Sequence, residues 1–178
     1  MGFFSRLMGV QGNSSQQELA RAVSNLIARI DILYSLAHDM DVDYGFSGVY
    51  SISSSVRMDL LSFALHIAAS DGVLEQNEVN AINTLLSANF TYADCKEIIE
   101  ETDFATKGFN SLVPITFKLL TELAKAHPDI AREFAEGLAS TYREIGLVVA
   151  AADGYIDSRE RRNLDDFTDM LYRYIRSI

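Results

Sequence analysis

Two stretches of the sequence decide how this chain folds: residues 65–78, LHIAASDGVLEQNE, and residues 147–160, LVVAAADGYIDSRE. At an offset of 82 they share Leu, Ala, Ala, Asp, Gly and Glu, and three further pairs keep an apolar or acidic character. Each stretch is typical of an apolar helix that ends at an Asp-Gly turn and is followed by a second helix. A repeated helix-turn-helix unit is therefore the expected centre of the fold.

The rest of the chain is expected to be helical as well. Only two prolines interrupt a sequence rich in Leu, Ala, Ile and Glu, a composition that favours helices. Apolar spacing predicts helices over 19–40, 54–68, 92–101, 111–127, 130–152 and 158–178, and one more that starts soon after residue 72. We therefore expect an all-α fold of about seven helices, with two pseudo-symmetric helix-turn-helix repeats and a long N-terminal helix.

The long helix over 19–40 carries a heptad pattern of apolar residues. Such a seam packs onto its own domain or against a second copy of the protein. Ile27 and Tyr34 widen the apolar stripe, which favours packing onto the same domain, and assembly through the seam is the alternative. Residues 41–53 contain two glycines and no helical period, so we expect a linker that divides an N-terminal segment, 1–53, from a helical domain, 54–178. The seam residues are Leu19, Val23, Leu26, Ile30 and Leu33.

Charge and cysteine content exclude several classes of function. Twenty-five acidic and fifteen basic residues give a formal net charge of -10, which disfavours binding to nucleic acid. The single cysteine, Cys95, can form neither an internal disulfide nor a multi-cysteine metal site. No apolar run approaches the roughly twenty residues that span a bilayer. We expect a cytoplasmic protein that does not bind nucleic acid.

The repeated turn resembles part of a calcium loop but lacks its first half. Asp71, Gly72, Leu74 and Glu78 match positions five, six, eight and twelve of an EF-hand, and the second copy matches in the same way. Positions one and three, which should be oxygen ligands, are instead Ile67 and Ala69 in the first copy and Val149 and Ala151 in the second. Because these apolar residues belong to the preceding helix, neither turn is expected to form an EF-hand.

The acidic side chains of the two turns have two interpretations. In the first, Asp71 and Asp153 accept hydrogen bonds from backbone amides near the next helix, and Asp157 forms a capping box with Glu160. In the second, the two turns pack together and pool their carboxylates around a divalent cation, because hard cations prefer oxygen ligands. The cation ligands would then be Asp71, Glu75, Glu78, Asp153, Asp157 and Glu160.

Asp71 and Asp153 are the expected anchors of such a cation site. Both are predicted in the last turn of a helix, immediately before a glycine. The partial negative charge of that helix end disfavours an anion by about 0.3–1 kcal/mol. A repeated placement of this kind suggests compensation by a hydrogen bond or by a bound cation.

At these residues the sequence resembles the TerB family of tellurite resistance, whose members carry an Ala-Ala-Asp-Gly turn followed by an aliphatic residue, an acidic residue and a glutamate. The same domain type is similar to one in membrane-anchored J-domain co-chaperones. The resemblance covers about residues 54–178 and is strongest in AASDGVLEQNE and AAADGYIDSRE. It implies an all-helical domain, an acidic surface suspected of binding a divalent metal such as calcium, magnesium or zinc, and a non-enzymatic role in stress response. It also implies protein partners, often in complexes at the inner face of the membrane.

The sequence carries no recognisable catalytic machinery. It lacks a phosphate-binding glycine loop, a Gly-x-Ser-x-Gly elbow and a His-Glu-x-x-His helix. His38, His66 and His127 are far apart, and His66 and Cys95 are expected to be buried core residues. The Glu-x-x-His pairs of helical di-metal proteins are missing, which makes a metal-dependent hydrolase the least favoured alternative. We expect a non-enzymatic binding or adaptor protein, with a structural module that assembles through the 19–40 helix, also as a homo-oligomer, as the main alternative.

Overall fold

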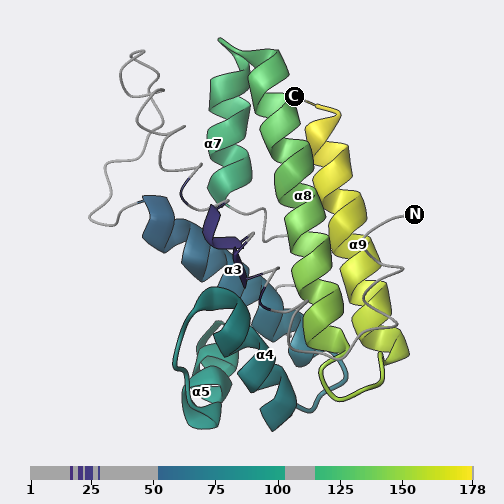
Figure 1. The fold of residues 1–178 in the computed structure, drawn as a ribbon. Helices are drawn as coiled ribbons and strands as arrows, with labels where there is room; N and C mark the ends of the chain where they lie inside the picture. Colours follow the sequence, from purple (N-terminus) through teal and green to yellow (C-terminus); the bar gives the residue numbers. More distant parts are fainter. Residues whose placement is uncertain are drawn as a thin grey trace.

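The computed structural model of the chain describes residues 52–102 and 115–177, together with a few helical residues between 17 and 28. The two long ranges contain helices and no strand (Figure 1). The prediction of an all-α fold is confirmed. The helices are α3 (Ile52–Ala68), α4 (Gln76–Leu86), α5 (Tyr92–Thr102), α7 (Ile115–Ala124), α8 (Pro128–Ala150) and α9 (Ser158–Ile175).

Helix α3 is the central element of the described fold. It contacts α4, α5, α7, α8 and α9, and α8 packs along α9 on one side and α7 on the other. Figure 1 shows α8 and α9 as an antiparallel pair, with α4 and α5 grouped at the lower end of the molecule. Each repeat therefore contributes one helix on either side of its turn: α3 and α4 in the first, α8 and α9 in the second.

The core between the repeats is built around three aromatic rings. Phe63 of α3 lies 5.0 Å from Tyr142 of α8 and 4.6 Å from Phe167 of α9, measured between ring centroids. All three side chains are buried. Gly146 brings α8 close to the other two helices, because a Cβ there would lie 2.5 Å from Leu164 Cδ1 and 3.0 Å from Phe63 Cζ. This close approach fixes how the two repeats dock.

Several helix ends differ from the predicted ones. Helix α3 begins at Ile52, inside the expected linker, and α9 ends at Ile175. The predicted helix over 111–127 ends earlier, at Ala124, and His127 is instead the N-cap residue of α8. Pro128 follows at the first helical position, where its missing N–H costs no hydrogen bond. These shifts are small and do not change the order of the elements.

The N-terminal segment contributes at least one residue to the core. Val23 is 1% exposed and belongs to the buried cluster formed by the helices of the two repeats. This burial agrees with the prediction that the seam packs onto its own domain. The other seam residues, Leu19, Leu26, Ile30 and Leu33, and most of the predicted 19–40 helix lie outside the described residues.

Candidate functional site: the paired Asp-Gly turns

The two Asp-Gly turns have the same local structure. Gly72 has a φ of +96° and Gly154 a φ of +94°, in the left-handed region that favours glycine. In the first turn, Asp71 Oδ1 accepts the N–H of Val73 at 2.8 Å, and in the second, Asp153 Oδ1 accepts the N–H of Tyr155 at 2.8 Å. The sequence repeat is therefore a structural repeat.

The prediction that Asp71 and Asp153 lie in the last turn of a helix is wrong. Helix α3 ends at Ala68 and α8 at Ala150, so Asp71 and Asp153 each lie three residues beyond the helix. Their side chains bond an amide two residues ahead, as in an Asx turn, and not an amide of the following helix. The helix dipole therefore gives no separate reason for a cation at these positions.

Each following helix begins with a capping box. The N–H of Asp157 donates to Glu160 Oε2 at 2.8 Å, and Asp157 Oδ1 accepts the N–H of Arg159 at 2.7 Å, which confirms the predicted box. In the first repeat the N–H of Glu75 donates to Glu78 Oε2 at 2.7 Å in a second box. This box was not predicted, because Glu is not a usual N-cap residue. The offset of 82, which aligns Glu75 with Asp157, was the available signal.

The structure brings the two turns into contact. Arg159 Nη1 donates to the backbone oxygen of Asp71 at 2.9 Å, and Asn163 Nδ2 donates to Ser70 Oγ at 2.9 Å. Ser70 Oγ in turn donates to the backbone oxygen of His66 at 2.8 Å. In Figure 1 the α3–α4 and α8–α9 connections lie at the same end of the molecule. The pairing of the turns, on which the cation hypothesis depends, is present.

Glu78 and Glu160 meet between the repeats. Their side chains are hydrogen-bonded to each other, and the two residues are only 4% and 5% exposed. Burial, followed by the charge of Glu160, raises the pKa of Glu78 to about 8, while its bond to the Glu75 amide acts in the opposite direction. Burial also raises the pKa of Glu160. Burial and the neighbouring carboxyl group therefore favour the protonated form of Glu78 at neutral pH.

The six predicted cation ligands have three different roles in this arrangement. Two are the buried pair, two occupy N-cap positions and two close the Asx turns. The charge of Asp71 acts on both buried glutamates, and that of Asp153 on Glu160. Within residues 52–102 and 115–177, no three His, Cys, Asp or Glu side chains are arranged to hold a metal ion. Carboxylate oxygens suit a hard cation, but of the six predicted ligands only Glu78 and Glu160 are brought together.

The other candidate residues have structural roles. Burial lowers the pKa of His66 to about 4, so this side chain is neutral at physiological pH. Cys95 is fully buried, and burial followed by the charge of Asp94 raises the pKa of its thiol. A thiol that stays protonated is a poor nucleophile, as expected of a core cysteine. His38 lies outside the described residues.

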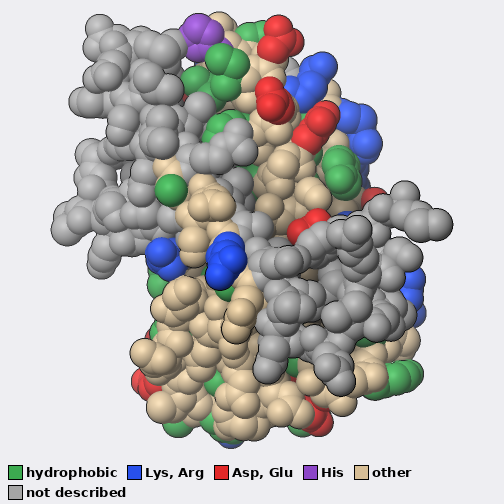
Figure 2. Space-filling model, viewed as in Figure 1, with side chains coloured by type: hydrophobic (Ala, Val, Ile, Leu, Met, Phe, Trp, Pro, Cys, Tyr) green, Lys and Arg blue, Asp and Glu red, His purple; other side chains and the backbone are tan. Residues whose placement is uncertain are grey.

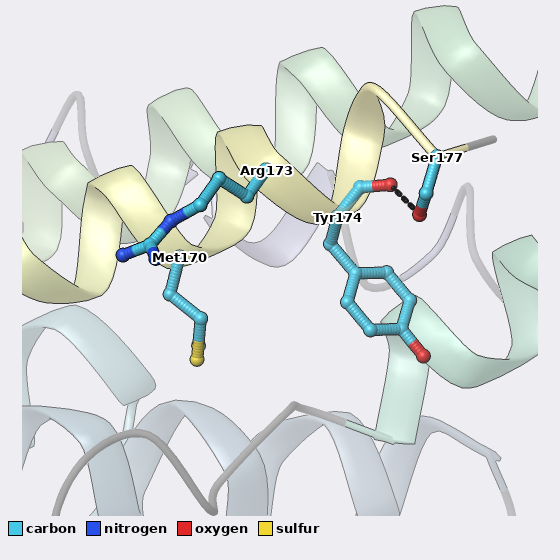
Figure 3. Close-up of a pocket in the computed structure, with 4 residues that line it drawn as sticks. All are labelled: Met170, Arg173, Tyr174 and Ser177. Carbon is cyan, nitrogen blue, oxygen red and sulfur yellow. Dashed lines mark hydrogen bonds between the residues drawn. The ribbon is translucent and has the colours of Figure 1, made fainter.

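A pocket lies at the end of α9, far from the turns. Met170, Arg173, Tyr174 and Ser177 line this open pocket, where Ser177 Oγ donates to the backbone oxygen of Tyr174 at 2.6 Å (Figure 3). Figure 2 shows acidic side chains next to Lys and Arg side chains over the upper part of the molecule. Among the described residues that line it, Arg173 is the one charged side chain, and the pocket is open, so it has no feature that selects a ligand.

Comparison with known proteins identifies one family. The model of the family described as tellurite resistance protein TerB matches residues 57–175. This range includes both Asp-Gly turns and lies within the expected helical domain of 54–178. No curated protein and no solved structure gives a significant match. Among the described residues, no helix is long and apolar enough to cross a membrane.

Proposed function

The chain belongs to the TerB family of tellurite resistance proteins, and on this basis we propose that it is a non-catalytic binding protein that responds to divalent cations at its paired Asp-Gly turns. The observation that carries the proposal is the buried Glu78–Glu160 pair, contributed by two different repeats. Two buried carboxyl groups in contact must be neutralised, because an isolated buried charge is strongly unfavourable. A proton or a cation can meet this requirement.

The chemistry of the turns supports calcium or magnesium, with zinc as the third candidate. The acidic side chains of the two turns offer carboxylate oxygens, which hard cations prefer. Glu78 and Glu160 would hold the cation, and Asp71 is placed to strengthen the negative potential at both. A bound cation would supply positive charge between the N-termini of α4 and α9. The residues of the chain would position it through the capping boxes, which hold both glutamate side chains in place.

The proposed role is binding in a stress response, with protein partners in a complex at the inner face of the membrane. The family assignment and the family's implied properties support this part of the proposal. The alternative, assembly through the 19–40 seam, receives less support because Val23 is 1% exposed and packs into the protein's own core. A buried seam residue is not available to a second copy.

Calorimetric titration of the metal-stripped full chain with calcium, magnesium and zinc tests the cation site. We expect saturable binding with release of a proton, detected as a binding enthalpy that depends on the ionisation enthalpy of the buffer. The Glu78→Gln, Glu160→Gln double variant should lose this binding. The matched control is Glu133→Gln, Glu136→Gln, which neutralises two exposed carboxylates of α8. Absence of saturable binding, or equal binding by both double variants, would refute the proposal.

A further inference from the structure

The paired turns expose an apolar side chain in each repeat. Val73 is 58% exposed and Tyr155 is 69% exposed, and the two residues are equivalent at the offset of 82. Both directly follow the glycine of the turn, in the short segment before the second helix of the repeat. The next side chain, Leu74 or Ile156, points inward and packs on the core. Val73 and Tyr155 are therefore directed to the outside, while the side chain that follows each of them is directed to the core.

The fold does not require apolar side chains at these two positions. Each turn is closed by the backbone N–H of Val73 or Tyr155, which donates to the preceding aspartate, and the side chain takes no part in that bond. A polar residue would keep the same turn and avoid exposing apolar surface to water. Exposed apolar side chains that gather at one end of a protein are typical of a surface that contacts another molecule.

The surroundings of these two residues determine what kind of molecule fits. Contact of Arg159 with the backbone oxygen of Asp71 joins the turns, so Val73 and Tyr155 occupy the same end of the bundle. Four carboxylates lie in the two turn segments, Asp71, Glu75, Asp153 and Asp157. The first two turns of α9 add three exposed guanidinium groups, Arg159, Arg161 and Arg162, and two further exposed carboxylates, Asp165 and Asp166, so the surroundings keep a net negative charge. A complementary partner must combine apolar side chains with positive charge.

We propose that Val73 and Tyr155, with the carboxylates around them, form a docking surface for a basic, apolar peptide segment of a partner protein. The apolar side chains supply affinity through burial, and the acidic rim selects Lys or Arg over Asp or Glu. The same rim disfavours an anionic lipid surface, which would be repelled. This inference rests on the proposed binding role and names the chemistry of its partner, and it does not need a bound cation.

Fluorescence anisotropy with three labelled synthetic peptides of equal length tests the docking surface. The first peptide mixes Lys and Leu, the second replaces each Lys by Glu, and the third replaces each Leu by Ser. Titrations are run with the full chain in chelator, at low and at physiological ionic strength. Because no divalent cation is present, failure of the cation site and failure of the docking surface give different results.

The decisive comparison uses two matched double variants. Val73→Ser, Tyr155→Ser removes the proposed surface, and Ile130→Ser, Tyr172→Ser removes exposed side chains of similar type near the start of α8 and the end of α9. Figure 1 shows that these helix ends lie at the opposite end of the molecule from the turns. All four side chains are exposed, so we expect both variants to keep the unfolding temperature of the wild type.

We expect the Lys–Leu peptide to bind best, with the Val73→Ser, Tyr155→Ser variant weakening its affinity by tenfold or more. The Ile130→Ser, Tyr172→Ser variant should bind it like the wild type, and added salt should weaken but not abolish the binding. The inference is overturned if none of the peptides binds or if the Lys–Ser peptide binds equally well. Equal losses in the two double variants would also overturn it, because they would mean nonspecific adhesion.

Discussion

Replacing Glu78 by Gln should stabilise the protein at neutral pH. The folded chain binds the proton of the Glu78–Glu160 pair more tightly than the unfolded chain does, because the pKa of Glu78 is raised from 4.5 to about 8. The stability that Glu78 contributes is therefore highest below its unfolded pKa of 4.5 and is lost as pH rises towards about 8. Gln is neutral at every pH. Its oxygen can still accept the N–H of Glu75 and its amide can donate to Glu160.

The size of the effect follows from the two pKa values. At pH 7 the unfolded glutamate is ionised, and protonating it against a pKa of 4.5 costs about 3 kcal/mol. Gln removes this cost, so Glu78→Gln should gain up to about 3 kcal/mol at pH 7 and almost nothing at pH 4.5. For a chain of this length, that gain corresponds to an increase in Tm of roughly 6–12 °C.

Urea unfolding of the wild type and the variant at pH 4.5, 6, 7 and 8 checks the prediction. The free energy gained by Glu78→Gln should increase steadily over this series. Glu78→Ala is the control, because it removes the capping acceptor and leaves a cavity, and should destabilise the protein throughout the same pH range. A Gln variant that is less stable than the wild type at pH 8, or whose gain is independent of pH, would refute the raised pKa of Glu78.

Three further predictions concern the packing around the turns. Burial lowers the pKa of His66 to about 4, so the free energy of unfolding decreases as pH falls from 6.5 towards 4. His66→Gln should reduce this decrease, as measured by urea unfolding between pH 7 and 4.5. Gly146→Ala should cost about 1–3 kcal/mol because its Cβ meets Leu164, whereas the exposed Gly137→Ala should be neutral or stabilising, both measured by thermal unfolding. Gly154→Ala should cost about 1–2 kcal/mol through its positive φ, and an unchanged Tm would contradict the left-handed turn.

Local features of the molecule followed from the sequence because neighbouring residues produce them. The Asp-Gly pairs specify turns with positive φ at Gly72 and Gly154, and the Asp157–Glu160 spacing specifies a capping box. Their repetition at an offset of 82 was sufficient to predict the two helix-turn-helix units. The interior positions of Ile67 and Val149 were equally evident from the apolar pattern of the preceding helices.

The ends of the helices were less predictable because backbone geometry determines them. Asp71 and Asp153 were expected within a helix, but each preceding helix ends three residues earlier and leaves the aspartate free to bond an amide two residues ahead. The capping role of Glu75 was hidden for a related reason. An uncommon N-cap residue is recognised only from its hydrogen bond to the N3 position.

By itself, the sequence determined an all-helical chain with two acidic Asp-Gly turns, since helix periodicity and turn chemistry act over a few residues. Only the tertiary structure decided that the turns touch and that Glu78 and Glu160 share a buried site. That contact depends on how α3, α8 and α9 pack around Phe63 and Gly146, between residues more than eighty positions apart. Long-range packing of this kind leaves no local signal in the sequence, because any well-filled interface of similar volume would satisfy the same apolar pattern.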